Sequence, residues 1–336
     1  MPKSPKVSIG MPIFNGDNFV GSAIESILAQ TFSDFELIVS DNGSTDDTRQ
    51  ICERYASLDS RIRYLRHDQN VGAIANFNSL VALARGLYFK WAAHDDVCAS
   101  AYLERCVEIL DSRPEVVWCH CDSDMIDAAG KSWLERMPAN DEEIELDGSG
   151  KRRWAGLPRI DHDDPRPSKR FAGVLMGTRW CVDSYGLIRI DALHKSGLYP
   201  SIYGSEKVLI GELSLMGPTH QVNECLFQQR IHPAASAYQD DVAKQQQFVR
   251  ADSTKPFAST RFALFQAHLA VVRRAEVSRW QKFMCYIAIL RYATQARKWI
   301  RVMGRRMHGK GVGGGGRRII EAGSQHTEQL PSGASQ

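Results

Sequence analysis

Two adjacent aspartates, Asp95 and Asp96, follow the apolar residues of FKWAAHDD, residues 89–96. Because no CxxC motif or histidine-rich cluster lies nearby, such a carboxylate pair favours a hard divalent cation, Mg²⁺ or Mn²⁺. An ion of this kind uses one or two protein carboxylates and completes its coordination with water and phosphate oxygens. The pair therefore indicates a site for a nucleoside diphosphate. The alternative is that Asp96 caps a helix that starts near Ala99.

The tripeptide HDD occurs twice, and its second copy is His162, Asp163 and Asp164. An apolar, strand-like run precedes the first copy, whereas a Pro- and Arg-rich stretch surrounds the second. Ligands of open α/β sheets bind beyond the carboxyl ends of strands, so a functional pair belongs after a strand. We therefore expect the first copy to be functional and the second to lie in a solvated loop.

Strand-like and helix-like segments alternate along the first 127 residues. Five apolar runs predict strands, at residues 6–14, 35–40, 61–67, 86–93 and 116–122. The segments between them have the apolar spacing of helices, and Ser44 with Asp47 resembles a capping box at the start of the second one. This alternation predicts right-handed crossovers and a mostly parallel sheet with helices on both faces.

Polar residues stand at the carboxyl ends of four expected strands: Asn15, Asp41 with Asn42, Asn70, and Asp95 with Asp96. Parallel strands end at one rim, so these residues should converge on one cleft. Between about residues 130 and 168, charged residues alternate with Gly and Pro, which predicts a functional lid or a disordered segment. An amphipathic helix over residues 205–217 and a further strand ending near His232 are expected to follow.

The composition is that of a soluble globular protein, with 336 residues, of which 43% are hydrophobic and 24% charged. No apolar run has the length of a membrane span or a signal peptide, so we expect a cytoplasmic protein. The eight cysteines are scattered without a CxxC pair, which favours buried thiols over disulfides or a metal site. The net charge of +3 by itself identifies no partner.

The carboxyl-terminal part is basic, because Asp252 and Glu276 are nearly the only acids between residues 250 and 318. Helical spacing there gives an apolar stripe flanked by basic residues, as in a helix on an anionic membrane: Trp280, Phe283, Ile287, Leu290 and Ile300. The alternative is a helix packed on the preceding domain or on a second subunit. No recognition motif accompanies the charge, so we expect no nucleic acid partner.

Three motifs, in this order, resemble family 2 glycosyltransferases with the GT-A fold: VSIGMPIFNGDNFVGSAIESILAQTFSDFELIVSDNGSTDDT, then HDQNVGAIANFNS, then the first HDD. The resemblance is specific through about residue 127 and looser through Ser236. It implies an α/β fold of the GT-A type, with a Rossmann-like, mostly parallel sheet flanked by helices and followed by a C-terminal helical extension.

The chain is accordingly divided into three parts. Residues 1–240 are the expected GT-A glycosyltransferase domain, with a nucleotide-binding half at 1–127 and an acceptor-side half at 128–240. Residues 241–308 are a basic helical extension, and residues 309–336 are a flexible, glycine-containing tail.

The family's nucleotide contacts correspond to six residues at or after the first three expected strands: Pro12, Phe14, Asn15, Asp41, Asn70 and Gly72. By the same resemblance, Asp95 would contact the ribose or the sugar, and Asp96 would be the ligand of Mn²⁺ or Mg²⁺. His94 stands where the family often has another acid. Taken alone, it is typical of a surface histidine.

The second half carries two looser similarities. Glu206 matches the place of the general base that inverting transfer needs, and Glu212 on the same expected helix is the second choice. The alternative for Glu206 is a favourable charge in the first turn of a helix. The QQRIHP stretch resembles an Arg-x-His element, in which His232 would bind the metal and Arg230 the diphosphate, whereas an isolated histidine can equally be structural.

The resemblance thus implies a metal-dependent inverting glycosyltransferase that moves a sugar from a nucleoside diphosphate sugar to a hydroxyl acceptor. The acceptor would be a glycan or lipid-linked, in surface glycan or polysaccharide synthesis. If the basic helix binds lipid, the protein would be peripheral on the inner face of the cell membrane. If instead it binds a second subunit, the protein would be a homo-oligomer.

Three other classes of protein are alternatives to this enzyme. A nucleotidyltransferase would need a Gly-rich phosphate loop with Arg or Lys near the first strand, and MPIFNGDN has none. An HD-type metal phosphohydrolase would need further His and Asp ligands on helices, whereas this HDD follows a strand. A non-catalytic GT-A-like nucleotide-binding or scaffold protein would keep the fold without turnover.

Overall fold

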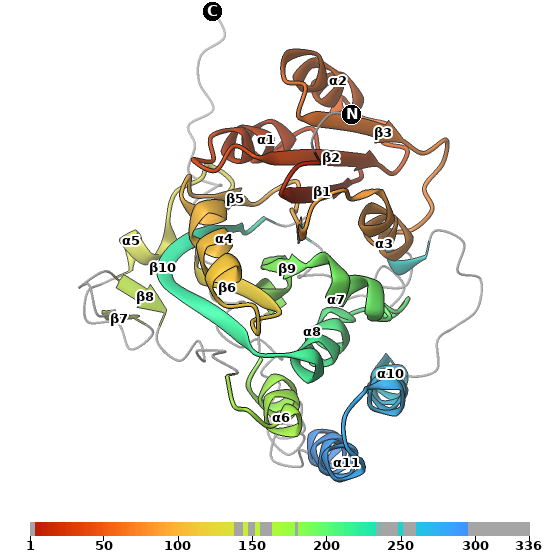
Figure 1. Ribbon diagram of the computed structural model, residues 1–336. Coiled ribbons are helices and arrows are strands. Elements are labelled where there is room, and N and C mark those ends of the chain that lie inside the picture. Colours follow the sequence, from red (N-terminus) through yellow and green to blue (C-terminus); the bar gives the residue numbers. More distant parts are fainter. Residues whose placement is uncertain are drawn as a thin grey trace, which may run out of the picture.

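The computed structural model describes residues 4–137, 144–146, 152–154, 163–178, 181–232, 235, 248–250 and 260–294. Its centre is an eight-stranded sheet with the order β3-β2-β1-β4-β9-β6-β10-β5 (Figure 1). Its strands are β1 Val7–Ile13, β2 Phe35–Asp41, β3 Ile62–Arg66, β4 Tyr88–Trp91, β5 Val97–Cys98, β6 Trp118–Ile126, β9 Leu187–Arg189 and β10 Thr219–Arg230.

Helices cover both faces of this sheet. They are α1 Val20–Leu28, α2 Thr48–Leu58, α3 Ala73–Leu83, α4 Tyr102–Ser112, α7 Ile190–Lys195 and α8 Glu206–Met216. Apolar side chains of α1, α2 and α4 form one buried cluster with the sheet, and those of α3, α7 and α8 form another. Because both faces are covered, every residue of β1 and of β2 is buried. The predicted α/β fold is confirmed.

Most strand pairs are parallel, as the alternation of elements predicted. β1 pairs with β2 and β4, β2 pairs with β3, and β6 pairs with β10, all in parallel. The short strand β9 runs antiparallel between β4 and β6, and β5 runs antiparallel beside β10. The carboxyl ends of β1, β2, β3 and β4 consequently lie at one rim.

Two C-terminal helices, α10 Thr260–Arg274 and α11 Arg279–Ala293, pack on α6 Pro167–Gly177 and on α8 (Figure 1). A third cluster of buried apolar side chains joins these four helices. On α11 the buried side consists of Cys285, Ala288 and Ile289. The structure therefore shows the predicted alternative of packing on the preceding domain, and it does so with one side of α11.

The helix α8 is not amphipathic, contrary to the prediction. All residues from Val208 to Leu215 are buried. Leu209 packs in the cluster beneath the sheet, whereas Val208 packs among residues of α6, α10 and α11. The prediction failed because the sequence of α8 does not show that other helices cover its outer side.

The described part of residues 130–168 contains secondary structure that the composition did not predict. α5 Trp133–Arg136 is capped by Ser132, whose hydroxyl accepts from the backbone N–H of Glu135. The strands β7 Ile144–Leu146 and β8 Arg152–Trp154 pair antiparallel outside the main sheet. Among the residues described, no helix is long and apolar enough to cross a membrane.

Candidate active site

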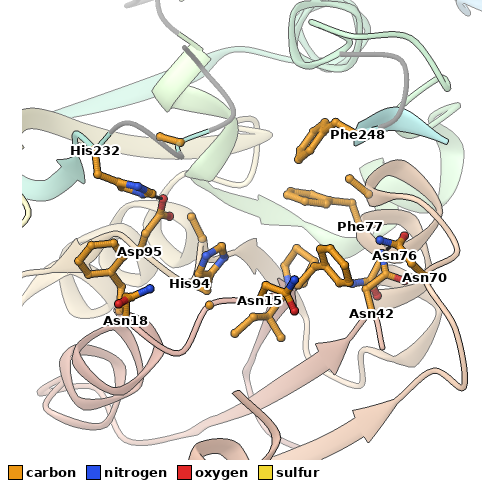
Figure 2. A pocket seen from close by; sticks show the side chains of 18 of the residues that line it. Asn15, Asn18, Asn42, Asn70, Asn76, Phe77, His94, Asp95, His232 and Phe248 are labelled. Carbon is orange, nitrogen blue, oxygen red and sulfur yellow. Dashed lines mark hydrogen bonds and ion pairs between the residues drawn. The ribbon is translucent and has the colours of Figure 1, made fainter. Parts of the chain in front are cut away.

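A cleft of about 660 Å³ opens at the rim where β1, β2 and β4 end (Figure 2). Its volume lies within the roughly 300–1,000 Å³ of small-molecule sites. It is lined by Pro12 of β1 and by Phe14 and Asn15, which follow this strand. Figure 2 shows Asp95 and His232 at one end, and a group of amide and aromatic side chains at the other: Asn42, Asn70, Asn76, Phe77 and Phe248.

Asp95 and His232 are in direct contact although they are far apart in sequence. The Nε2 atom of His232 lies 2.9 Å from Oδ2 of Asp95, and the ring of Phe19 packs against the imidazole. Burial acts to raise the pKa of Asp95, but the hydrogen bond from His232 and the nearby His94 outweigh it and hold that pKa below its usual value. One end of the cleft thus presents a charged carboxylate beside an imidazole.

His94 is a cleft residue rather than the surface histidine that the sequence suggested. It lines the cleft between the loop after β1 and Asp95. A Cβ atom at Gly16 would overlap the imidazole of His94, so only glycine permits this packing. Burial lowers the pKa of His94, which keeps its ring neutral at neutral pH.

Asp96 is not one of the described residues that line the cleft. Its Oδ1 atom accepts a 2.9 Å hydrogen bond from the backbone N–H of Arg230. Burial, and then the charge of Asp95, raise the pKa of Asp96 well above its usual value. This hydrogen bond joins the residue before β5 to the end of β10, and the predicted role of Asp96 as a metal ligand stays a prediction.

Arg230 is a second departure from the prediction, which made it a diphosphate contact. Its guanidinium is buried and donates to backbone oxygens of Asp95, Asp127 and Ala128, at 2.8, 3.1 and 3.1 Å. The guanidinium also lies over the ring of Phe19. Arg230 therefore positions the loop that carries Asp95, and it is not among the described residues that line the cleft.

Asp41 is likewise buried, with 0% of its surface exposed, and it does not line the cleft. Its carboxylate accepts from the backbone N–H of Ser44 at 2.8 Å and from the hydroxyl of Tyr64 at 2.6 Å. Arg66 forms an ion pair with the same carboxylate at 3.3 Å. Residues of the neighbouring strand β3 thus engage this carboxylate, and the predicted nucleotide contact through Asp41 stays a prediction.

The loops after β2 and β3 supply amides to the cleft. Asn42 and Asn70 both line it and are hydrogen-bonded to one another. Gly72, for which a nucleotide contact was predicted, instead lies just before α3 with a φ of 87°, a left-handed conformation that favours glycine. Its N–H donates to Asn70, so its place in the structure is to hold Asn70.

Glu206 is the first residue of α8 and does not itself line the described part of the cleft. Burial raises the pKa of its carboxyl. Tyr185 does line the cleft, and burial together with the charges of Asp96, Asp95 and Glu206 raises the pKa of its hydroxyl. Tyr185 thus lies within electrostatic range of both the Asp95 end of the cleft and Glu206.

Glu212, the second choice for a general base, has a structural role. Its buried carboxylate pairs with Arg274 of α10 and accepts from the backbone N–H of Gly197 at 2.9 Å. A carboxylate engaged in this way links α8 to the C-terminal helices. It is not placed to accept a proton from a substrate.

The second HDD copy is separate from the cleft. Asp163 is exposed, and Asp164 pairs with Arg166 at 2.7 Å just before α6, while His162 lies outside the described residues. The lining residues that were not predicted include Asn76, Phe77, Tyr185 and Phe248. The sequence carried no distinct signal for them, because Asn76 shares its helix with the polar residues Asn78 and Ser79. The other three are aromatic residues typical of any core.

Comparisons with known proteins agree with this geometry. Residues 8–170 match the family model for glycosyl transferase family 2. A protein of Rickettsia prowazekii named as an uncharacterized glycosyltransferase, RP339, is 38% identical over 119 residues, which are 34% of this chain and 36% of that protein. The match thus spans about a third of the length of this relative.

Two solved structures resemble most of the chain at low identity. S. aureus TarS 1-349 in complex with UDP-GlcNAc has a TM-score of 0.59 at 14% identity, over 87% of this chain and 74% of that one. The mannosyltransferase PcManGT from Pyrobaculum calidifontis, in complex with GDP-Man and Mn²⁺, has a TM-score of 0.50 at 15% identity, over 90% and 85%. The chain has the GT-A fold, and its residues 8–170 are similar to glycosyl transferase family 2.

Proposed function

We propose that this protein transfers a sugar from a nucleoside diphosphate sugar to a hydroxyl acceptor, with inversion at the anomeric carbon and with Mn²⁺ or Mg²⁺ as cofactor. The observation that carries the proposal is the Asp95–His232 contact at one end of a cleft whose other end is built from amides and aromatic rings. The first end suits a cation and phosphate oxygens, and the second suits a nucleoside.

The charges along the cleft support a role for a cation. Among the lining residues that the structure describes, none is Lys or Arg, so the protein offers a diphosphate no permanent positive charge there. The described part of the chain has no cluster of three His, Cys, Asp or Glu side chains suited to a metal. A cation would therefore be held by Asp95 and His232 together with phosphate oxygens, an arrangement typical of Mg²⁺ and Mn²⁺. We assign the carboxylate ligand to Asp95 in place of Asp96.

Glu206 is proposed as the general base. When bound, the cation would neutralise charge that develops on the departing diphosphate. The acceptor hydroxyl must lose a proton as it attacks the anomeric carbon, and a carboxylate on the acceptor side takes it. Burial near Tyr185 gives Glu206 a raised pKa and hence a stronger affinity for that proton. Its carboxylate pairs with no basic side chain in the described part of the chain, in contrast to Glu212.

Thermal unfolding with a panel of nucleoside diphosphates, with and without Mn²⁺ or Mg²⁺, tests the proposal. At a concentration a hundred times its dissociation constant, a true ligand adds about 2.7 kcal/mol to the free energy of unfolding. We expect stabilisation by a nucleoside diphosphate that largely disappears when EDTA removes the cation. Stabilisation without hydrolysis or transfer of the sugar would favour a non-catalytic binding protein, and no stabilisation by any of these ligands would contradict the proposal.

The exposed side of α11 supports a location at a membrane surface. Trp280, Phe283 and Leu290 are 65%, 52% and 57% exposed on the side of α11 opposite its buried residues. Arg279 and Arg291, both exposed, stand next to this stripe in sequence. Exposed apolar side chains with arginines beside them are typical of helices that bind anionic lipid. We therefore propose peripheral binding to the inner face of the cell membrane and a lipid-linked or surface glycan acceptor.

Replacing Trp280 and Phe283 by Asp should weaken binding to anionic vesicles by about tenfold or more. Two aromatic side chains that would be buried in the lipid surface are lost, and two charges that repel anionic lipid are added. Vesicle sedimentation at low and high salt measures the effect. Leu58→Asp, at an exposed position on α2, is the matched control and should leave binding unchanged. Equal vesicle binding by all three proteins would end the membrane proposal, and an altered oligomeric state of the double variant would indicate a second subunit.

A further inference from the structure

The proposed position of the cation determines which part of the donor lies at each end of the cleft. A cation at Asp95 and His232 draws the diphosphate to that end, and the nucleoside must then extend towards Asn42, Asn70 and Phe77 (Figure 2). This assignment rests on the proposed function. The ring of Phe77 offers a face on which any nucleobase can stack, so stacking alone does not distinguish one base from another.

The orientation of two side-chain amides at this end is fixed by backbone donors. Oδ1 of Asn42 accepts from the N–H of Val71 at 2.8 Å, and Oδ1 of Asn70 accepts from the N–H of Gly72 at 2.8 Å. A backbone N–H only donates, so the atom that faces it must be the amide oxygen in each case. The Asn42 amide in turn donates from Nδ2 to Oδ1 of Asn70 at 3.0 Å.

Asn70 consequently presents a hydrogen-bond donor and no free acceptor. Its Oδ1 atom already accepts two hydrogen bonds, which engage both lone pairs. Its Nδ2 atom donates to no described residue, and the side chain is partly exposed in the wall of the cleft. Asn76 is different, because its amide is engaged on both sides by Ser40: Oδ1 accepts from the hydroxyl at 2.6 Å, and Nδ2 donates to the carbonyl at 2.9 Å.

We propose that Asn70 selects donors whose nucleobase carries an exocyclic keto oxygen over donors whose nucleobase carries an amino group at that place. Uracil, thymine and guanine present the oxygen, which accepts from the Nδ2 group of Asn70. Cytosine and adenine present an amino group, which is itself a donor. Two donors that face each other leave both without a partner wherever the bound base excludes water, and this costs binding free energy.

Binding of UDP, dTDP, GDP, CDP and ADP in the presence of Mn²⁺ tests the inference on the wild-type protein. We expect the three keto-base diphosphates to bind roughly tenfold or more tightly than CDP and ADP, as one unsatisfied polar group implies. If CDP or ADP binds as tightly as the keto-base diphosphates, the inference is wrong while the proposed function stands. If none of the five binds, the proposed function fails and the inference fails with it.

Asn70→Asp sharpens the test because it keeps the loop and changes only the group that faces the base. The carboxylate Oδ1 can still accept from Gly72 and Asn42, whereas Oδ2 replaces the donor with an acceptor. We expect the preference for UDP over CDP to disappear or reverse. Asn18→Asp adds the same charge elsewhere in the cleft wall and should weaken all five diphosphates without changing their order. If Asn70→Asp only weakens all five equally, Asn70 does not read the base.

Discussion

Asp95→Asn is expected to abolish the Mn²⁺-dependent part of nucleoside diphosphate binding and to lower the transfer rate by more than about a hundredfold. Mutation of a residue that only supports a metal ligand typically lowers metal affinity or activity by about ten- to a hundredfold. Loss of a charged ligand itself should therefore exceed that range. The amide keeps the size of the carboxylate and can still contact His232, so the fold should persist. Isothermal titration with Mn²⁺ and UDP or GDP measures the binding, and a donor-hydrolysis assay measures turnover.

Two matched variants distinguish the role of Asp95 from that of the neighbouring Asp96. Asp96→Asn retains an oxygen that accepts from the N–H of Arg230, so it should keep most of the metal-dependent binding. Asp164→Asn alters the other HDD copy, whose carboxylate pairs with Arg166, and should have no effect on binding. If Asp96→Asn removes the Mn²⁺ dependence while Asp95→Asn preserves it, the assignment made from the sequence is correct and the present one is wrong.

The sequence predicted the cleft but not which carboxylates face it. The order of strands and helices and the apolar runs were enough to place Asn15, Asn70 and Asp95 at one rim, because parallel strands share a carboxyl edge. Asp95 lies in a bend just before β5, so the sequence alone does not show which of Asp95 and Asp96 faces the cleft. Only the pairing of β5 with β10 decides which, and that register is set by residues more than 120 positions later.

Partners from distant segments engage other residues for which the sequence predicted a role. Asp41 is satisfied by Tyr64 and Arg66, which the parallel register of β2 and β3 brings beside it. Arg230 is satisfied by three backbone carbonyls, a kind of partner that no side-chain motif reveals. The capping box expected from Ser44 and Asp47 is absent, because the hydroxyl of Ser44 accepts from the backbone N–H of Asn15 instead. Each residue type suited its expected role, and tertiary contacts gave it another.

For the C-terminal helix α11, the spacing of apolar residues in the sequence predicted the exposed side but not the side that packs on the domain. Of the predicted stripe, Trp280, Phe283 and Leu290 are exposed, Ile287 is partly buried, and Ile300 lies outside the described residues. The side that packs on the domain is made of Cys285, Ala288 and Ile289, of which the first two are too small to stand out in a search for apolar residues. Small side chains allow helices to approach closely, so the packed face of α11 was less conspicuous in the sequence than the exposed one.

Glu206→Gln is expected to lower kcat by about a hundred- to ten-thousand-fold while leaving the donor dissociation constant near the wild-type value. The amide has almost the shape of the carboxylate but accepts no proton at neutral pH. Single-turnover kinetics with donor and acceptor, together with a separate titration of the donor, distinguish the two quantities. A loss of donor binding in this variant would mean that Glu206 shapes the cleft and does not act as the base.

The pH profile and a neighbouring carboxylate give the sharper discrimination. A general base works only when deprotonated, so kcat should fall as the pH drops through the pKa of Glu206, which burial raises above the usual 4.5, and Glu206→Gln should lose this acid limb. Glu212→Gln weakens a charge-assisted contact with Arg274, so it should lower the free energy of unfolding by about 1.5–3 kcal/mol yet retain the limb. If Glu212→Gln is stable but inactive while Glu206→Gln turns over normally, the base is Glu212, and the link between α8 and α10 must open during catalysis.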